Sequence, residues 1–353
     1  MNRLVPIASL VVLAAAAAAP TCGAAPVGAG LAPLLAALAH ADPRARAEAA
    51  CRLAERGDAA PGTIAALESV LADQREVADL ACRGDVRWGP RRVTVLTSPG
   101  LEAAAALAEM GPVGFPALQR TLRSGAPAAR ANAAWALGES RDPRGGAALV
   151  AALADASPEV RRQAAGALGE LEEAGTEREL VRLLDDAAPE VRRAALDALG
   201  ELEHRPAETA IAARLADADA RVRESAAEAL GEIGSAAALP ALERALADPS
   251  WRVRVAALDA LDEIDAAGAA AIAARALDDA DARVRVEALE LLADEGSGRE
   301  VGAVADGLED ADWRVREAAA EALGEIGDAR GRAALRKALA DDSWRVRAKA
   351  AEA

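Results

Sequence analysis

The chain has 353 residues, a formal net charge of −16, two histidines, one phenylalanine and no tyrosine. The surplus of negative charge argues against a protein that binds nucleic acid or anionic membranes, because those partners are held by Lys and Arg. The hydrophobic content of 52% is inflated by alanine and does not indicate a membrane protein.

The N-terminal segment differs from the rest of the chain. Met1-Asn2-Arg3 is a short positive region, residues 4–19 are apolar and uncharged, and small residues follow up to Ala25. This order predicts a secretory signal peptide over 1–25, cleaved near Ala24 or Ala25, and therefore an exported, periplasmic protein with no membrane span after cleavage. An uncleaved anchor or a misassigned start is the alternative.

Cys22 raises the minority alternative of a lipid anchor, although Ala19-Pro20-Thr21 departs from the usual Leu-Ala-Gly type of lipobox. Cys51 and Cys82 fall at first-helix positions of neighbouring repeats in a divergent helical region, 26–84. Equivalent points on stacked helices lie roughly 10 Å apart, which is more than a disulfide spans, so we expect two buried free thiols.

Residues 85–100 (DVRWGPRRVTVLTSPG) interrupt the helical pattern. Apolar and polar residues alternate on both sides of a Gly-Pro pair at 89–90, which predicts a β-hairpin or an ordered loop.

The same insertion holds the densest cluster of aromatic and arginine residues in the chain. Such residues are enriched among interface anchors, and loops on rigid scaffolds often carry function. We therefore regard the cluster as a candidate partner-binding site; the alternative is a tolerated insertion that packs over the early repeats. Its members are Arg87, Trp88, Arg91 and Arg92.

Residues 101–353 form a regular array with a period of 31 residues. A fixed period in this range predicts a solenoid, in which each unit buries its apolar face against its neighbours. We expect an all-α fold, a right-handed α-solenoid of antiparallel helix pairs with one small insertion. The repeated segments begin at Glu159, Glu190, Arg221, Arg252, Arg283, Arg314 and Arg345, with a weaker copy at Ala128.

One repeat, 157–187, shows how each unit is built. Ser157 is a candidate N-cap, Pro158 takes the first helical position, and the second helix carries Leu180 and Leu184. We call the first helix of each repeat helix A and the second helix B. The buried stripe of this helix A is expected at Val160, Ala164, Ala167, Leu168 and Leu171. The caps recur at Ser157, Ala188, Asp219, Ser250, Asp281, Asp312 and Ser343.

Two charged positions recur throughout the array and predict a structural ladder of charge-assisted hydrogen bonds across the turns between units. An aspartate ends helix B at Asp155, Asp186, Asp217, Asp248, Asp279, Asp310 and Asp341. An arginine follows six residues later, at Arg161, Arg192, Arg223, Arg254, Arg285, Arg316 and Arg347.

The Asp-(five residues)-Arg pair, the Val-Arg-x-x-Ala helix and the Pro-Ala-Leu openings at Pro116 and Pro240 resemble HEAT repeats. The Ala-Leu-Gly-Glu-Ile-Gly runs at 229–234 and 322–327 resemble the short-repeat subtype of phycobiliprotein lyases and deoxyhypusine hydroxylases. The resemblance covers the chain from about Leu31 onward, apart from the insertion. It implies the fold and leaves the function open.

The resemblance allows the enzymatic branches to be tested. The hydroxylase branch holds two irons through His-Glu pairs, but neither His40 nor His204 is followed by Glu, so that site is excluded. A lyase that attaches bilin to a protein needs no metal, yet it works in the cytosol with a partner subunit, which conflicts with the signal peptide. We assign no catalytic, cofactor-binding or metal-binding residue.

Carboxylates four residues apart on helix A predict an acidic stripe on the outer, convex side. It is either a docking face for a basic partner or divalent cations, or a solvated consensus that keeps the array soluble. The pairs are Asp197/Glu201, Glu228/Glu232, Asp259/Glu263, Glu290/Asp294 and Glu321/Glu325.

Basic residues recur at one position of helix B and predict a track on the concave side that fits an acidic protein segment. The alternative is that each cation complements its helix dipole. The track comprises Arg120, Arg182, Arg244, Arg275 and Lys337, and is broken at Ala151, Ala213 and Asp306.

Trp251, Trp313 and Trp344 take the first position of helix A, where we expect each to cover the seam between repeats rather than to stack on nucleobases. The last helix A begins at Trp344 without a helix B after it. This arrangement predicts an end-cap partner, self-association or a truncated chain.

The sequence thus predicts a non-catalytic protein–protein interaction scaffold of the bacterial cell envelope, which binds through the solenoid surface, the 85–100 insertion or both. The alternatives are a bilin-lyase-like or other cofactor-transfer helper, and a regulatory subunit of an envelope enzyme.

Overall fold

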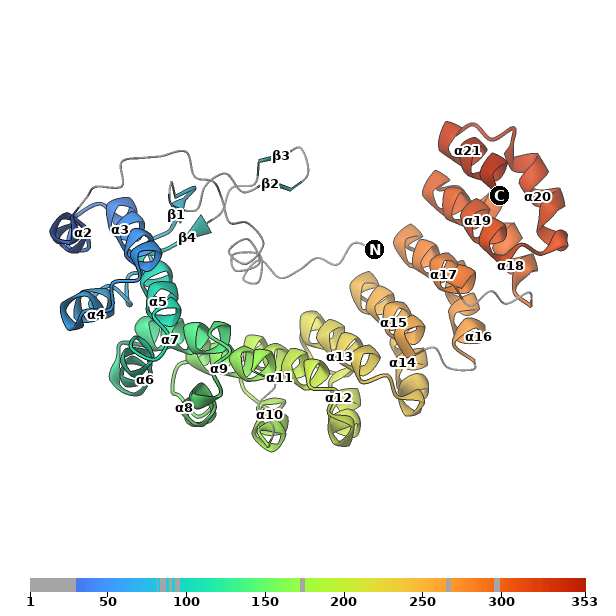
Figure 1. The fold of residues 1–353 in the computed structure, drawn as a ribbon. Coiled ribbons are helices and arrows are strands. Elements are labelled where there is room, and N and C mark those ends of the chain that lie inside the picture. Colours follow the sequence, from blue (N-terminus) through green and yellow to red (C-terminus); the bar gives the residue numbers. More distant parts are fainter. Residues whose placement is uncertain are drawn as a thin grey trace. The chain divides into compact units, whose positions relative to one another are not determined.

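The computed structural model describes residues 30–80, 82, 87–88, 91–92, 96–171, 175–264, 268–294 and 299–353. The chain divides into two compact units, 1–179 and 180–353, and each is a stack of helix pairs (Figure 1). The predicted signal peptide, 1–25, lies outside the described residues.

The first unit combines helices with two small β-ladders. Its helices are α2 (Leu31–Ala37), α3 (Pro43–Arg56), α4 (Pro61–Glu68), α5 (Pro99–Glu109), α6 (Phe115–Ser124), α7 (Pro127–Glu139), η2 (Pro143–Gly145), α8 (Gly146–Ala152) and α9 (Pro158–Glu170). Its strands are β1 (Val77–Ala78), β2 (Arg87–Trp88), β3 (Arg91–Arg92) and β4 (Leu96–Thr97). Helix α10 (Glu177–Leu183) contains the boundary between the units.

The second unit is helical throughout its described residues. Its elements are α11 (Pro189–Glu201), η3 (Arg205–Ala207), α12 (Glu208–Arg214), α13 (Ala220–Ile233), η4 (Ala236–Ala238), α14 (Leu239–Ala245), α15 (Trp251–Ile264), α16 (Ala269–Ala273), η5 (Ala274–Asp278), α17 (Ala282–Asp294), α18 (Val301–Asp306), η6 (Gly307–Glu309), α19 (Trp313–Ile326), η7 (Ala329–Gly331), α20 (Arg332–Ala338) and α21 (Trp344–Glu352). The all-α solenoid predicted from the 31-residue period is confirmed.

Helix ends follow local chemistry. Asp219 and Asp312 cap their helices by accepting the backbone N–H two residues later, whereas Ser157 and Ser343 make no such side-chain bond. Gly234 ends α13 with φ of 65°, a left-handed conformation that glycine adopts without a Cβ penalty. The capping role predicted for every polar cap residue is therefore correct at the aspartates and wrong at these two serines.

A glycine near the end of helix A lets the next helix A approach closely. A Cβ on Gly231 would lie 2.8 Å from the Cα of Ala260, and one on Gly138 would lie 2.8 Å from the Cα of Ala167. Real Cβ atoms do not tolerate such distances, so a larger residue would force the helices apart. Alanines complete these contacts, which explains the alanine-rich composition.

The ladder contacts link successive repeats. In each of six pairs, arginine Nε and Nη2 donate to the two carboxylate oxygens of an aspartate 25 residues later, at 2.6–3.0 Å. The pairs are Arg130–Asp155, Arg192–Asp217, Arg223–Asp248, Arg254–Asp279, Arg285–Asp310 and Arg316–Asp341.

Each ladder arginine was also expected to bond the aspartate six residues earlier. It does so, but it donates to the main-chain oxygen of that aspartate and not to its carboxylate. Arg223 Nη1 donates to the main-chain oxygen of Asp217 at 2.8 Å, while the Asp217 carboxylate receives Arg192 and the N–H of Asp219. We call one ladder arginine with the two aspartates that it contacts a rung. Each rung connects the turn before one helix A with the turn before the next helix A, because the planar guanidinium presents donors on two edges.

These hydrogen bonds stabilise the ionised aspartates. The donors of Arg130 lower the pKa of Asp155, and those of Arg316 lower the pKa of Asp341. The ladder side chains are also mostly buried. In the Arg223–Asp248 pair, for example, the arginine side chain is 13% exposed and the aspartate side chain 8% exposed. Removing one partner from such a pair leaves the other charge poorly solvated.

We predict that Arg223→Ala lowers the free energy of unfolding of the second unit by about 2 kcal/mol, because it removes charge-assisted hydrogen bonds at one rung. Urea unfolding followed by circular dichroism measures the change. Arg221→Ala is the matched control on the same helix, since its side chain is exposed, and we expect an effect below about 0.5 kcal/mol. Equal losses in both variants would contradict a specific role for the rung.

Candidate interaction surfaces

The insertion contains the predicted hairpin. Strands β2 and β3 pair antiparallel, with Arg87 opposite Arg92 and Trp88 opposite Arg91. The side chains of these four candidate residues lie outside what the structure describes, so their role in partner binding stays a prediction.

A two-stranded neck carries the hairpin. Strands β1 and β4 pair antiparallel, with Val77 opposite Thr97 and Ala78 opposite Leu96. The hydroxyl of Thr97 donates to the Glu102 carboxylate at 2.8 Å, and both residues are buried. The non-helical segment thus begins before the expected insertion, 85–100, and ends when α5 starts at Pro99.

The neck is joined to the helices behind it through Gly100. The N–H of Gly100 donates to the Asp73 carbonyl at 2.8 Å, and the side chain of Asn132 on α7 donates to the Leu71 carbonyl at 2.9 Å. A Cβ on Gly100 would lie 2.5 Å from the Leu71 oxygen, so only glycine fits at this crossing.

Helix α3 holds the other side of the neck. Arg44 donates to the carbonyl oxygens of Ala78 and Asp79, at 3.1 and 2.8 Å. Ala47 packs with Val77 and Leu80 in a small apolar cluster that Cys82 also contacts.

Cys51 on α3 and Cys82 form a disulfide, with their Cα atoms 6.3 Å apart. The expectation of two free thiols is wrong. It assumed that Cys82 lies on a helix stacked beside α3, whereas the chain after α4 is extended at β1 and passes over α3. An extended segment that crosses a helix can bring its Cα atoms closer to that helix than the roughly 10 Å that separates two stacked helices.

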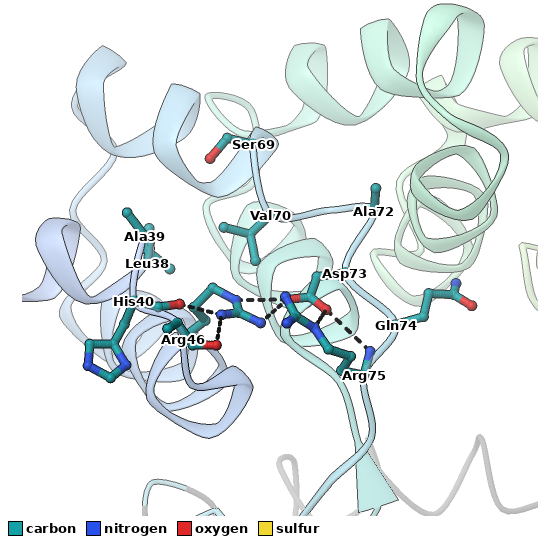
Figure 2. A pocket seen from close by; sticks show the side chains of 11 residues that line it. Leu38, Ala39, His40, Arg46, Ser69, Val70, Ala72, Asp73, Gln74 and Arg75 are labelled. Carbon is teal, nitrogen blue, oxygen red and sulfur yellow. Dashed lines mark hydrogen bonds and ion pairs between the residues drawn. The ribbon is translucent and has the colours of Figure 1, made fainter.

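Beside the neck lies a solvent-open hollow of about 810 Å³, lined by residues of the α2–α3 turn and of the segment after α4 (Figure 2). Asp73 lies at its centre and accepts hydrogen bonds from both Arg46 and Arg75. Arg46 is buried and also donates to the carbonyl oxygens of His40 and Ala41, as a ladder arginine does. The hollow therefore surrounds a contact like those of the ladder, between Arg46 and Asp73, which is modified because Arg75 also donates to Asp73.

Three of the basic residues predicted to form a track on helix B have local partners. Arg120 pairs with Glu68 at 2.9 Å, Arg275 pairs with Glu243, and Arg244 donates to the Pro240 carbonyl of its own helix. The other two positions of the predicted track are Arg182 and Lys337. A role for them in partner binding stays a prediction.

The faces of the second unit are opposite to those expected. Within this unit the A helices lie side by side, and the B helices are spread farther apart (Figure 1). The closely spaced layer lies on the inner side of a curved stack, so the acidic stripe lies on the inner face and the basic positions lie outside. The sequence period identifies the buried side of each helix but not the direction of curvature.

Crowding perturbs the acidic stripe. Partial burial raises the pKa of Glu228 to about 7, and the charges of Asp197 and Glu224 add to the shift. Partial burial likewise raises the pKa of Glu232 to about 7, with contributions from Glu201 and Glu263 on the adjacent helices. Both side chains still reach solvent, so water screens part of this repulsion.

Tryptophans cover seams between repeats, as expected. The guanidinium carbon of Arg283 lies 3.4 Å from the ring centre of Trp251 in the preceding repeat. Arg345 lies 5.0 Å from the ring centre of Trp313 in the same relation. These cation–π contacts place the first two tryptophans in a structural role.

Among the described residues, no group of three or more His, Cys, Asp or Glu side chains is arranged to hold a metal ion. The same part of the chain contains no helix that is long and apolar enough to cross a membrane.

We predict that reducing the Cys51–Cys82 disulfide destabilises the first unit by roughly 3–4 kcal/mol, because the bond closes a loop with a sequence separation of 31 residues. Thermal unfolding of the Cys51→Ala/Cys82→Ala variant measures the loss, and peptide mapping without reductant detects the bond. A wild-type protein whose cysteines both react with alkylating reagent before unfolding would contradict the pairing.

We predict that the second unit loses stability as pH rises from about 5 to about 8. Glu228 and Glu232 hold protons in the folded state up to about pH 7 but lose them near 4.5 when unfolded, so ionisation favours unfolding in this window. Urea unfolding at three pH values measures the slope. The Glu228→Gln/Glu232→Gln variant should flatten it, and an unchanged slope would contradict the assignment.

Below about pH 4 the opposite trend is expected. The ladder aspartates have lowered pKa values, so their contribution is present above the usual aspartate pKa and is lost as they become protonated.

Comparisons with known proteins place the repeats in a family. The HEAT-repeat profile matches residues 146–215, 207–293 and 269–353, and the profile of the PBS lyase HEAT-like repeat matches 129–155. A comparison with curated proteins finds no matching sequence.

Three solved structures are reported as similar to this chain, and only the first has a TM-score above 0.5. The YibA protein of E. coli is 22% identical with a TM-score of 0.51, over 70% of this chain and 94% of that one. The CpcE–CpcF complex of phycocyanin lyase from a Nostoc species is 24% identical with a TM-score of 0.41, over 67% and 91%. Human deoxyhypusine hydroxylase is 25% identical with a TM-score of 0.32, over 67% and 93%.

The HEAT-repeat matches together span more than half of the sequence, and the helix pairs, ladder and 31-residue period agree with them. This chain belongs to the HEAT-repeat family.

Proposed function

We propose that the protein is a non-catalytic protein–protein interaction scaffold of the bacterial cell envelope, and that the hairpin of β2 and β3 is its main recognition element. One observation carries the proposal: the base of the hairpin is fastened to the helical array by a disulfide, by the β1–β4 ladder and by Arg44. HEAT-repeat proteins commonly bind other proteins, and the family membership supports the same class of function.

A fastened base favours binding because it lowers the conformational entropy that a loop loses when it docks. The hairpin sequence supplies three arginines beside Trp88. Arginine forks bind carboxylates, and tryptophan provides apolar area with little conformational freedom to lose. The complementary surface is therefore an acidic patch with an apolar centre on another protein.

The disulfide also supports export. Structural disulfides persist in oxidising compartments and are rare in the cytosol. This agrees with the signal peptide proposed for 1–25 and with a periplasmic location. It weighs against a cytosolic bilin lyase, although a regulatory subunit of an envelope enzyme would use the same surfaces and remains the second candidate.

The test is crosslinking followed by pull-down from the native envelope fraction. It compares the intact protein with a variant in which Val86 to Val95 are replaced by a short Gly-Ser linker. We expect specific partners to be lost from the variant, because the linker removes the arginines and Trp88 but keeps the neck.

Two controls accompany this experiment. Circular dichroism must show the array still folded, and peptide mapping must show the Cys51–Cys82 bond. Partners retained by both proteins would move recognition to the helical faces. No specific partner with either protein would refute the scaffold function.

A further inference from the structure

Small residues lie where neighbouring A helices of the second unit meet, at two positions 29 residues apart in the sequence. They hold the helices close, since a Cβ on Gly231 would lie only 2.8 Å from the Cα of Ala260. The small pairs are Gly200/Ala229, Gly231/Ala260, Ala293/Ala322 and Gly324/Ala353. At the junction of α15 with α17 the same two positions hold Asp262 and Leu291. This bulkier pair keeps α15 and α17 from the same close approach.

The packing around this junction agrees with the change of residues. Helices α15 and α17 pack together less extensively than α13 with α15 or α17 with α19. Leu291 is only 3% exposed, so its side chain takes up space between helices and not in solvent. The B helices of the two repeats are also irregular, because α16 continues as the 3₁₀ segment η5 and α18 as η6. Short 3₁₀ segments within a helix often mark a hinge.

The N-terminal ends of α15 and α17 stay joined. Arg254 on α15 donates to both carboxylate oxygens of Asp279, each at 2.7 Å. The guanidinium carbon of Arg283 on α17 lies 3.4 Å from the ring centre of Trp251, the first residue of α15. Asp262, in contrast, lies near the C-terminal end of α15. A junction that is fixed at one end and wedged at the other can pivot about its fixed end.

Two carboxyl groups meet between the helices of this junction. The side chain of Glu287 on α17 shares a hydrogen bond with the Asp259 carboxyl on α15. Such a bond needs a proton on one of the two groups, because an ionised carboxylate has no donor. Partial burial raises the pKa of Glu287 well above its usual range, and the bond to Asp259 adds to the shift. At the equivalent position Ser225 and Lys349 bond a carboxylate of the preceding helix A.

The other charged groups near this pair do not neutralise it. Asp262 on α15 and Glu290 on α17 are acidic and raise the pKa of Glu287 further. The arginines of the adjacent elements η5 and α19 are paired with other carboxylates. These pairs are Arg275–Glu243, Arg314–Asp312 and Arg316–Asp341. Among the acidic residues of these elements, Glu317 and Glu321 lie against Arg345 and Lys349, and Asp278 and Glu325 are exposed. Ionisation of Glu287 therefore sets like charges against one another.

We propose that the α15–α17 junction is a hinge of the second unit, which is closed when Glu287 and Asp259 share a proton and open when both are ionised. The Arg254 rung is its fixed end. Opening separates the C-terminal ends of the two helices and widens the acidic stripe at this one place. The inference concerns the second unit alone and does not rest on the proposed scaffold function.

Distances between pairs of spin labels, measured by double electron–electron resonance on the full chain, test the hinge. The hinge pair is Ala236→Cys with Gly302→Cys, which spans the α13–α15 and α15–α17 junctions. The control pair is Arg205→Cys with Ala271→Cys, one repeat earlier, which spans only junctions that have a small pair. All four positions are exposed.

Labelling must be confined to the introduced cysteines. The label is a nitroxide joined through a thioether, and Cys22→Ser is present in every sample. Cys51 and Cys82 are held in their disulfide.

Between about pH 5 and about pH 10 we expect the distance of the hinge pair to lengthen and its distribution to broaden as Glu287 ionises. The control pair should change less. Glu287→Gln keeps the shape of the side chain but cannot ionise, so it should remove the extra response of the hinge pair. Asp262→Gly/Leu291→Ala restores the small pair of the other junctions and should keep the hinge pair short throughout.

Equal responses of the two label pairs would overturn the proposal, as would a hinge pair that stays unchanged over the whole pH range. An extra response that persists in the Glu287→Gln variant would overturn the role of the shared proton. Circular dichroism at each pH checks that every variant is folded. If the double variant does not fold, the comparison of the wild type with Glu287→Gln still decides the outcome.

Discussion

The array depends on a guanidinium that is shared between two turns. Each complete rung uses one edge of the arginine for the carbonyl of its own turn and the other edge for the aspartate of the next repeat, as Arg223 does with Asp217 and Asp248. The same aspartate accepts a backbone N–H, so it shapes the turn that begins the next helix. Stacking and turn geometry are therefore specified together, and a repeat with an added residue would misplace both.

Close packing of the A helices brings carboxylates of neighbouring repeats near one another. The glycine that brings α13 against α15 also brings Glu232 into range of Glu263, and the carboxylates oppose one another. At the equivalent glycine position α15 carries Asp262, and burial with neighbouring carboxyls raises the pKa of Glu287 on α17 well above its usual range. Neutral carboxyls and tight packing favour each other, which couples the spacing of this unit to pH.

The period was sufficient to predict the helix pairs, their apolar stripes and the residues of the ladder. It could not identify the partner of each arginine, because residues six and 25 positions away recur with equal regularity. It also left the direction of curvature open, so the acidic stripe was assigned to the wrong face. The disulfide was missed for a different reason: Cys82 lies where the repeat pattern is weakest, and only the path of the chain over α3 brings it near Cys51. The 31-residue separation of the two cysteines was the one signal available.

The arginine–aspartate contact of the ladder has a second role in the first unit. There the Asp73 carboxylate accepts hydrogen bonds from Arg46 on helix α3 and also from Arg75, in the segment that leads into β1. An interaction that elsewhere joins one repeat to the next here fixes the strand that supports the hairpin. The main-chain oxygen of Asp73 accepts the N–H of Gly100, which anchors the returning strand at its other end. The insertion is therefore connected to the array through Asp73 as well as through the Cys51–Cys82 disulfide and Arg44.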